Sequence, residues 1–181
     1  IVTLTIDMKD KSMNVINDEL GAAFVDVLDK IESNADIAGV IVTSGKKGSF
    51  VAGAEIEMLF ALETAEQAFE MIEEFKARLR RFEKLGKPVV ACINGTALGG
   101  GLEIALACHH RIALNHPKAK LGLPEVKLGV LPAGGGVTRL VRMLGLQPAF
   151  PYLMEGKEMK PAEAHSIGVV DELAESNEEM L

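Results

Sequence analysis

The chain has 181 residues, of which 48% are hydrophobic and 25% charged, a composition typical of one globular domain with a well-buried core. Its net charge of −7 argues against a basic face that follows nucleic-acid phosphates, so we expect no nucleic-acid partner. No apolar run approaches the roughly 20 residues that cross a bilayer, so we expect no membrane span.

Strands and helices alternate along the first half of the chain. Apolar and β-branched residues predict a strand at 1–7, and Asn17 then predicts a helix start with a buried stripe from Leu20 to Ile31. A short apolar strand is expected at 39–43, and residues 50–59 carry a strand end, a glycine and an apolar continuation. Thr64 opens a long helix through a capping box, and its predicted buried stripe includes Phe69, Phe75 and Phe82.

The second half continues the alternation. We expect strands at 89–93, 111–114 and 169–173, and helices at 100–108, at 137–144 and from Pro161. This order predicts an α/β fold with largely parallel strands, and no linker divides it. The chain begins inside a strand-like pattern at Ile1 and stops after an acidic stretch, so we expect residues 1–181 to be one domain of a longer protein.

The two cysteines, Cys92 and Cys108, lie in apolar stretches. Such a placement is typical of buried, reduced thiols, and the spacing alone leaves a disulfide open. The adjacent pair His109 and His110 makes a poor chelate because the two side chains point in different directions, so we expect no metal.

Two glutamates follow glycine-containing turns. Glu103 ends the run NGTALGGGLE at 94–103, and Glu125 ends LGLPE at 121–125. Both lie among apolar residues, where a carboxylate is costly to bury unless its charge is used or its pKa is raised. The alternatives are structural: Glu103 complements a helix dipole, and Glu125 is a surface acid paired with Lys127.

Two small-residue segments expose backbone donors. In VAGAEI at 51–56, three small residues let a ligand approach, with the N–H of Ala54 aimed at its oxygen. The glycines at 99–101 expose N–H groups at a helix start, where negative charge is stabilised. Tight packing is the alternative for each segment, but together with the glutamates they predict acid–base chemistry on a polarised carbonyl.

Three motifs together resemble the crotonase superfamily: residues 51–56, residues 94–103 and the run LGLPEVKLGVLPAGGGVTRL at 121–140. The chain is most similar to enoyl-CoA hydratases, and among those to the N-terminal hydratase domains of multifunctional β-oxidation enzymes. The resemblance implies a spiral of repeated β-β-α units. It also implies that the C-terminal helices and a following dehydrogenase domain lie outside this chain. Glu55 departs from the family pattern, where Asp is common.

The resemblance also implies the site residues. It gives the catalytic acids as Glu103 and Glu125 and the oxyanion-hole donors as the N–H groups of Ala54 and Gly100. The implied substrate contacts are Ala52, Gly53, Glu55, Ile56, Gly101, Pro124 and Leu131. Lys46 and Lys47 are candidates for the coenzyme A phosphates, with a solvated loop pair as the alternative. Residues 58–62 are candidates for an acyl tunnel, with the buried face of a short helix as the alternative.

The implied reaction is hydration of trans-2-enoyl-CoA to 3-hydroxyacyl-CoA in fatty-acid β-oxidation, with Δ3-Δ2-enoyl-CoA isomerisation as a second activity. Acyl-CoA is then a substrate, and no cofactor is expected. The resemblance further implies a homo-oligomer (trimer or hexamer) or a larger β-oxidation complex, in the bacterial cytoplasm or the mitochondrial matrix. A thioester hydrolase of the same superfamily and a non-catalytic binding relative are the alternatives.

Overall fold

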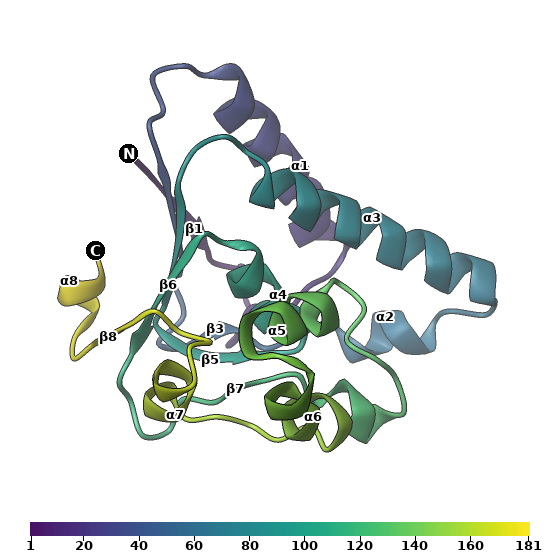
Figure 1. The fold of residues 1–181 in the computed structure, drawn as a ribbon. Coiled ribbons are helices and arrows are strands. Elements are labelled where there is room, and N and C mark those ends of the chain that lie inside the picture. The colour runs from purple at the N-terminus through teal and green to yellow at the C-terminus, as the bar shows by residue number, and fades with distance from the viewer.

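The structure is a computed structural model that describes all residues, 1–181. Its main sheet has five parallel strands in the order β1-β2-β4-β6-β8, of which β1, β6 and β8 are labelled in Figure 1. These strands are β1 (Val2–Ile6), β2 (Val40–Ser44), β4 (Val89–Ile93), β6 (His110–Leu114) and β8 (Glu172–Ala174). A second parallel sheet holds β3 (Gly48–Val51), β5 (Gly95–Leu98) and β7 (Leu121–Gly122), in the order β3-β5-β7.

The two sheets are built by a repeated step. The chain passes from β2 to β3, from β4 to β5 and from β6 to β7, so each step adds one strand to each sheet. Helices after β3 and β5 return the chain to the main sheet, where parallel pairing requires such a crossover. The α/β spiral of β-β-α units predicted from the sequence is therefore confirmed.

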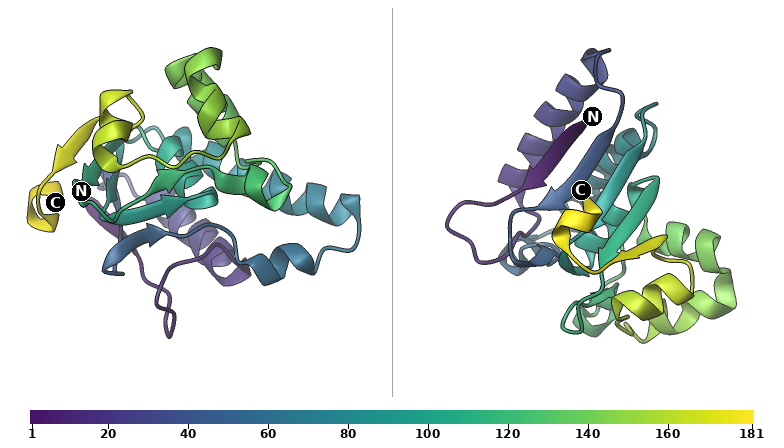
Figure 2. Two further views of the ribbon diagram at one scale, coloured as in Figure 1. Left: turned by 90° about the horizontal axis from the view of Figure 1, so that it is seen from below. Right: turned by 90° about the vertical axis from the view of Figure 1, so that its left-hand side faces the viewer.

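Two long helices, α1 (Asp18–Ser33) and α3 (Ala65–Glu83), lie side by side and pack on each other, as both Figures 1 and 2 show. Asn17 accepts a hydrogen bond from the N–H of Leu20, and Thr64 forms the predicted capping box. The two helices meet at an edge-to-face aromatic pair, Phe24 and Phe82, with ring centroids 5.2 Å apart. Phe69 was wrongly assigned to the buried stripe: it is 66% exposed, because it lies near the start of α3, beyond the part of the helix that packs on α1.

The helix α4 (Gly100–Ala107) lies between the sheets and the outer helices, and all its residues after Gly100 are buried. The shorter helices are α2 (Ile56–Phe60), η1 (Pro124–Leu128), α5 (Gly136–Leu144), α6 (Leu146–Met154), α7 (Pro161–Ser166) and α8 (Asn177–Met180). The sequence did not predict α6, because Pro151 lies inside it and proline ordinarily ends a helix. The reading of residues 58–62 as a buried face is wrong, because α2 has no buried residue and Phe60 is 85% exposed.

The last strand begins later than the predicted 169–173. The N–H groups of Val169 and Val170 both donate to the carbonyl of Ala164 and so close α7. Only Glu172–Ala174 then pair with β6. Cys92 and Cys108 are buried free thiols, as predicted. None of the helices combines the length and the apolar character needed to cross a membrane.

Candidate active site

Glu103 lies in the first turn of α4 and is only 2% exposed. Its Oε1 accepts a hydrogen bond of 2.7 Å from the N–H of Gly136. Burial raises the pKa of this carboxyl above its usual value, although the N–H groups of Gly136 and Gly134 and the charge of Arg139 oppose the shift. A side chain held this deep does more than complement a helix dipole at the surface.

The turn at Gly134, Gly135 and Gly136 surrounds the Glu103 carboxylate with backbone alone. A Cβ on Gly134 would lie 2.5 Å from Oε2 of Glu103, and a Cβ on Gly136 would lie 2.9 Å from Oε1. Gly135 has a φ of 103°, which residues with a side chain rarely adopt. These glycines belong to the third sequence motif, but their role as the seat of Glu103 was missed. The run of three glycines was the available signal.

Glu125 lies in η1, on the segment that follows β7. Its Oε2 is buried and has no hydrogen-bond partner. Burial, opposed by a backbone hydrogen bond and assisted by the nearby charge of Glu103, raises the pKa of Glu125 to about 7. The alternative of a surface acid paired with Lys127 is wrong, because the two side chains form no ion pair.

The backbone N–H groups of Ala54 and Gly100 have no acceptor within the chain. At Ala54 this follows from a bridge with Ile16. The N–H of Ile16 donates to the carbonyl of Gly53, and the carbonyl of Ile16 accepts from the N–H of Glu55. Because successive residues of an extended segment face opposite sides, the N–H of Ala54 points away from Ile16. Gly100 is the first residue of α4, where N–H groups lack an intrahelical partner.

Gly99 joins these parts of the site. A Cβ at this position would lie 3.1 Å from Oε1 of Glu125 and 3.8 Å from the Cα of Gly53. The segment that carries Ala54, the start of α4 and the Glu125 carboxylate are therefore neighbours. The structure thus brings the two glutamates and the two unbonded N–H groups together around one helix start.

The other predicted contacts differ in exposure. Gly53 and Gly101 are buried, whereas Ala52 and Pro124 are half-buried. Ile56 and Leu131 are 49% and 71% exposed, so they lie at the rim. The Glu55 carboxylate bonds to Lys11 at 2.7 Å and to Asn17 at 3.4 Å, and those contacts lower its pKa.

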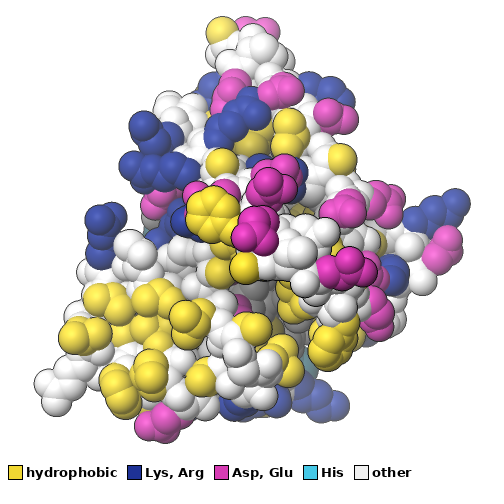
Figure 3. All heavy atoms as spheres, turned by 90° about the vertical axis from the view of Figure 1, so that its right-hand side faces the viewer, with side chains coloured by type: hydrophobic (Ala, Val, Ile, Leu, Met, Phe, Trp, Pro, Cys, Tyr) yellow, Lys and Arg dark blue, Asp and Glu magenta, His cyan; other side chains and the backbone are white.

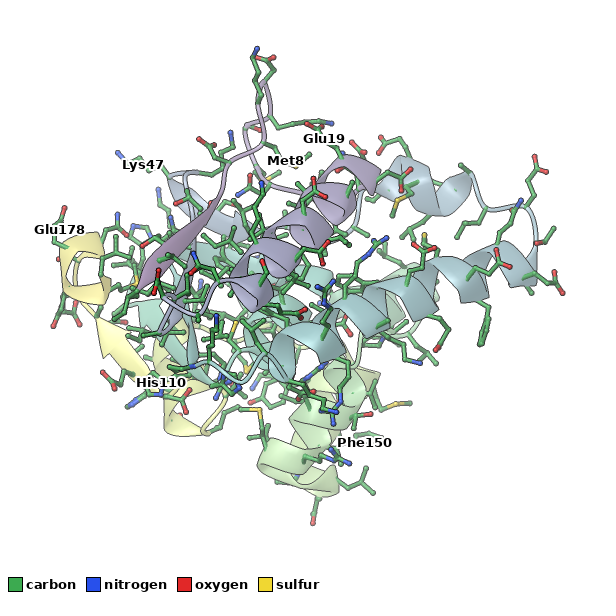
Figure 4. The ribbon with its side chains drawn as sticks, turned by 90° about the horizontal axis from the view of Figure 1, so that it is seen from above. Met8, Glu19, Lys47, His110, Phe150 and Glu178 are labelled. Carbon is green, nitrogen blue, oxygen red and sulfur yellow. The ribbon has the colours of Figure 1, made fainter.

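Two lysines precede β3, in the loop labelled by Lys47 in Figure 4. Lys47 is exposed. Lys46 is not the solvated loop residue that the sequence suggested, because its ammonium bonds to the carbonyl of Met8 at 2.5 Å and to Asp7 at 2.8 Å. Lys47 alone is therefore free to meet a phosphate.

The two histidines are engaged separately. Nδ1 of His109 accepts from the N–H of Val89 at 3.0 Å, and Nε2 of His110 lies 3.0 Å from Glu172. His110 lies toward the end of the molecule that carries α8 (Figure 4). No group of three or more potential ligands is arranged to hold a metal ion.

Known proteins share the sequence pattern and the fold of this chain. A family model described as enoyl-CoA hydratase/isomerase matches residues 2–181. The fatty acid oxidation complex subunit alpha of Shewanella halifaxensis (strain HAW-EB4) is 45% identical over 172 residues, covering 95% of this chain and 24% of that protein. The chain therefore spans about a quarter of the length of that curated relative.

Solved structures give the same result. An enoyl-CoA hydratase from Geobacillus kaustophilus HTA426 superposes with a TM-score of 0.91 at 32% identity, over 98% of this chain and 66% of that one. An enoyl-CoA hydratase from Thermoplasma volcanium GSS1 gives 0.87 at 32% identity, over 97% and 69%. By its sequence motifs, its fold and these matches, the chain belongs to the enoyl-CoA hydratase/isomerase family.

Proposed function

We propose that this domain adds water to the 2,3-double bond of a trans-2-enoyl-CoA and releases 3-hydroxyacyl-CoA, as a step of fatty-acid β-oxidation. One observation carries the proposal: the buried Glu103 and Glu125, whose Oε2 is buried without a partner, lie beside two backbone N–H groups that have no acceptor. An acyl-CoA thioester supplies the missing acceptor, because its carbonyl oxygen gains negative charge as water adds to C3.

In the proposed reaction the N–H groups of Ala54 and Gly100 donate to the thioester oxygen. Glu103 takes a proton from water as the water oxygen bonds to C3, and Glu125 gives a proton to C2. A proton passed from Glu103 to Glu125 restores the starting state. The same enolate and proton transfer move a double bond from position 3 to position 2, so we also propose enoyl-CoA isomerisation as a second activity.

The direct test adds crotonyl-CoA to the protein and follows the absorbance of the conjugated thioester. We expect the absorbance to fall without release of free coenzyme A thiol. Release of free thiol would instead indicate a thioester hydrolase, a reaction that does not need both glutamates. No turnover and no binding of a CoA ester would indicate a non-catalytic relative.

The pH dependence follows from the two carboxyls. The proposed mechanism needs Glu103 ionised and Glu125 protonated, so kcat/KM should fall above about pH 7 as Glu125 loses its proton. It should also fall in acid as Glu103, whose pKa lies above its usual value, becomes protonated. Both limbs belong to the coupled pair. Initial rates at subsaturating crotonyl-CoA test this expectation, and a flat profile from about pH 6 to 9 would contradict it.

Gly136→Ala should lower kcat while the protein stays folded. The added Cβ would lie 2.9 Å from Oε1 and 3.0 Å from Cγ of Glu103, so the carboxylate must move. A displacement near 1 Å can cost about 100-fold in rate. Gly136 is the first residue of α5, and Cδ1 of Leu123 also lies 3.0 Å from the added Cβ. Thermal unfolding, measured beside kcat, shows that the variant is folded, and an unchanged kcat would contradict the prediction.

We also propose that the domain works within a larger assembly, either a homo-oligomer or a β-oxidation complex like that of its relatives. Figure 3 shows apolar side chains gathered on the lower part of one face, and α6 carries Leu146, Phe150 and Met154 at more than half exposure. Phe150 lies far from Lys47 in Figure 4, so this surface is separate from the candidate phosphate contact. Light scattering of the purified protein would give the assembly state.

The bacterial cytoplasm or the mitochondrial matrix stays the expected location.

A further inference from the structure

Arg139 on α5 is a charged residue that the proposed reaction does not use. Its side chain is 13% exposed, and it reaches Glu83 at the end of α3, with Nε–Oε1 and Nη2–Oε2 distances of 3.3 and 3.4 Å. Its third contact is with the glycine turn, where Nη1 donates to the carbonyl of Gly134 at 3.1 Å. One guanidinium therefore ties the end of α3 to the turn that seats Glu103.

Besides Arg139, the turn is held by the bond from Gly136 to Glu103 and by the ring of Phe75, which lies against Gly134. Its three residues have no side chains, and Gly135 adopts a φ of 103°. A Cβ on Gly135 would lie 2.4 Å from Nη1 of Arg139, so the guanidinium packs directly on this residue. The N–H of Gly136, two residues after the carbonyl that Arg139 binds, donates to Glu103.

We infer that Arg139, anchored by Glu83, is a positioning residue that holds the Gly134–Gly136 turn and thereby fixes the Glu103 carboxylate for reaction. The expected changes in kcat rest on the proposed function. The expected change in the hydrogen bond between Gly136 and Glu103 does not, because that bond can be observed without any activity.

An effect of the Arg139 charge alone can be distinguished from an effect of Arg139 on the position of the Glu103 carboxylate. The charged side chains near Glu103 are Arg139 from α5, which lowers its pKa, and Glu125 from η1, whose own pKa the charge of Glu103 raises. Glu83 partly neutralises Arg139, and Arg80 also contacts Glu83. If Arg139 acted only by its charge, removing the charge of Glu83 would favour the ionised form of Glu103 and leave catalysis intact. If it acts by position, the same change should lower kcat.

The experiment compares Arg139→Met, Arg139→Lys and Glu83→Gln with the parent protein. Arg142→Met is the matched control, because Arg142 is an exposed residue one turn further along α5 and forms no ion pair. Three quantities are measured: kcat and KM with crotonyl-CoA, the pKa of Glu103 from its carboxyl ¹³C shift, and the amide proton shift of Gly136. Glu103→Gln assigns the carboxyl signal.

Positioning predicts that Arg139→Met and Glu83→Gln lower kcat about 10- to 100-fold with KM nearly unchanged. In Arg139→Met the pKa of Glu103 should rise, because the charge that lowers it is gone, and the Gly136 amide proton should lose its charge-assisted downfield shift. Arg139→Lys keeps the charge but not the planar fork, so it should restore the pKa more than kcat. The control, Arg142→Met, should match the parent in its kinetic constants, in the pKa of Glu103 and in the Gly136 amide proton shift.

Parental kcat, pKa and amide shift in Arg139→Met and Glu83→Gln would overturn the inference, even if both variants melted at a lower temperature. Parental kcat in Glu83→Gln with a lowered pKa of Glu103 would also overturn it, in favour of charge alone. If the parent itself did not hydrate crotonyl-CoA, the proposed function would fail, whereas the carboxyl and amide shifts would still decide the inference.

Discussion

Replacing either Glu103 or Glu125 with Gln is expected to lower kcat for crotonyl-CoA hydration by about 100- to 10,000-fold, the usual contribution of a positioned acid or base. Gln keeps the volume of the side chain and, at position 103, an oxygen that can still accept from the N–H of Gly136. It cannot exchange a proton, however. The loss should therefore appear in kcat much more than in KM, because the variants still bind the ester.

Glu178→Gln is a matched control, because Glu178 is exposed on α8, at the end of the molecule seen in Figure 4. This variant should hydrate crotonyl-CoA at the parental rate. If Glu103→Gln or Glu125→Gln retained more than about a tenth of the parental kcat, the pair would not be the proton-transfer machinery proposed here.

Stability separates a chemical loss from a folding defect at position 125. The pKa of Glu125 is raised from 4.5 to about 7 in the folded protein. A raised carboxyl pKa favours folding below about pH 4.5, and this contribution is lost as the pH rises through about 7. The parent therefore carries a buried charge at pH 8 that Glu125→Gln lacks. We expect the variant to melt at a higher temperature than the parent at pH 8 and at the same temperature at pH 4.

Much of the fold was predictable from local patterns. Caps at Asn17 and Thr64, and apolar runs such as residues 89–93, depend on near neighbours in the sequence, so they gave the helices and strands. The helix α6 was missed because Pro151 lies inside it and proline is ordinarily a helix breaker, yet packing against α5 and η1 stabilises the helix. The strand at β8 was placed too early because two of its apolar residues are used to close α7.

The site was predictable only in part. Glu103 and Glu125 stood out because a carboxylate among apolar residues is unusual, and the burial of Glu103 and of Oε2 of Glu125 bears out that signal. The contact of Arg139 with Glu83 joins residues 56 positions apart, and no local pattern marks such a pair. Phe75 was predicted as a core residue, but its ring also lies against the glycine turn, 2.4 Å from where a Cβ on Gly134 would be. Contacts of this kind depend on how α3, α4 and α5 meet.

Ala54→Pro is the second change with a large expected effect, and it addresses the backbone donors. Proline has no N–H, and the N–H of Ala54 has no acceptor in the chain, so the substitution removes a proposed donor without breaking an internal hydrogen bond. Loss of one oxyanion donor costs about 2.7–4 kcal/mol, or about 100- to 1,000-fold in kcat. The measurement is kcat for crotonyl-CoA together with thermal unfolding.

Two further variants decide whether the missing N–H is the cause of such a loss. Ala54→Gly keeps the N–H and should stay within a few-fold of the parent, whereas lactic acid incorporated at position 54 replaces the amide by an ester and removes the same N–H without a proline ring. Ala52→Pro is the contrasting case, because the N–H of Ala52 donates to the carbonyl of Asn14 at 2.9 Å and its removal should lower stability. Parental turnover in the ester protein would show that the N–H of Ala54 does not stabilise the transition state. A loss shared by the proline and ester proteins, but not by Ala54→Gly, would assign that role to this one backbone group.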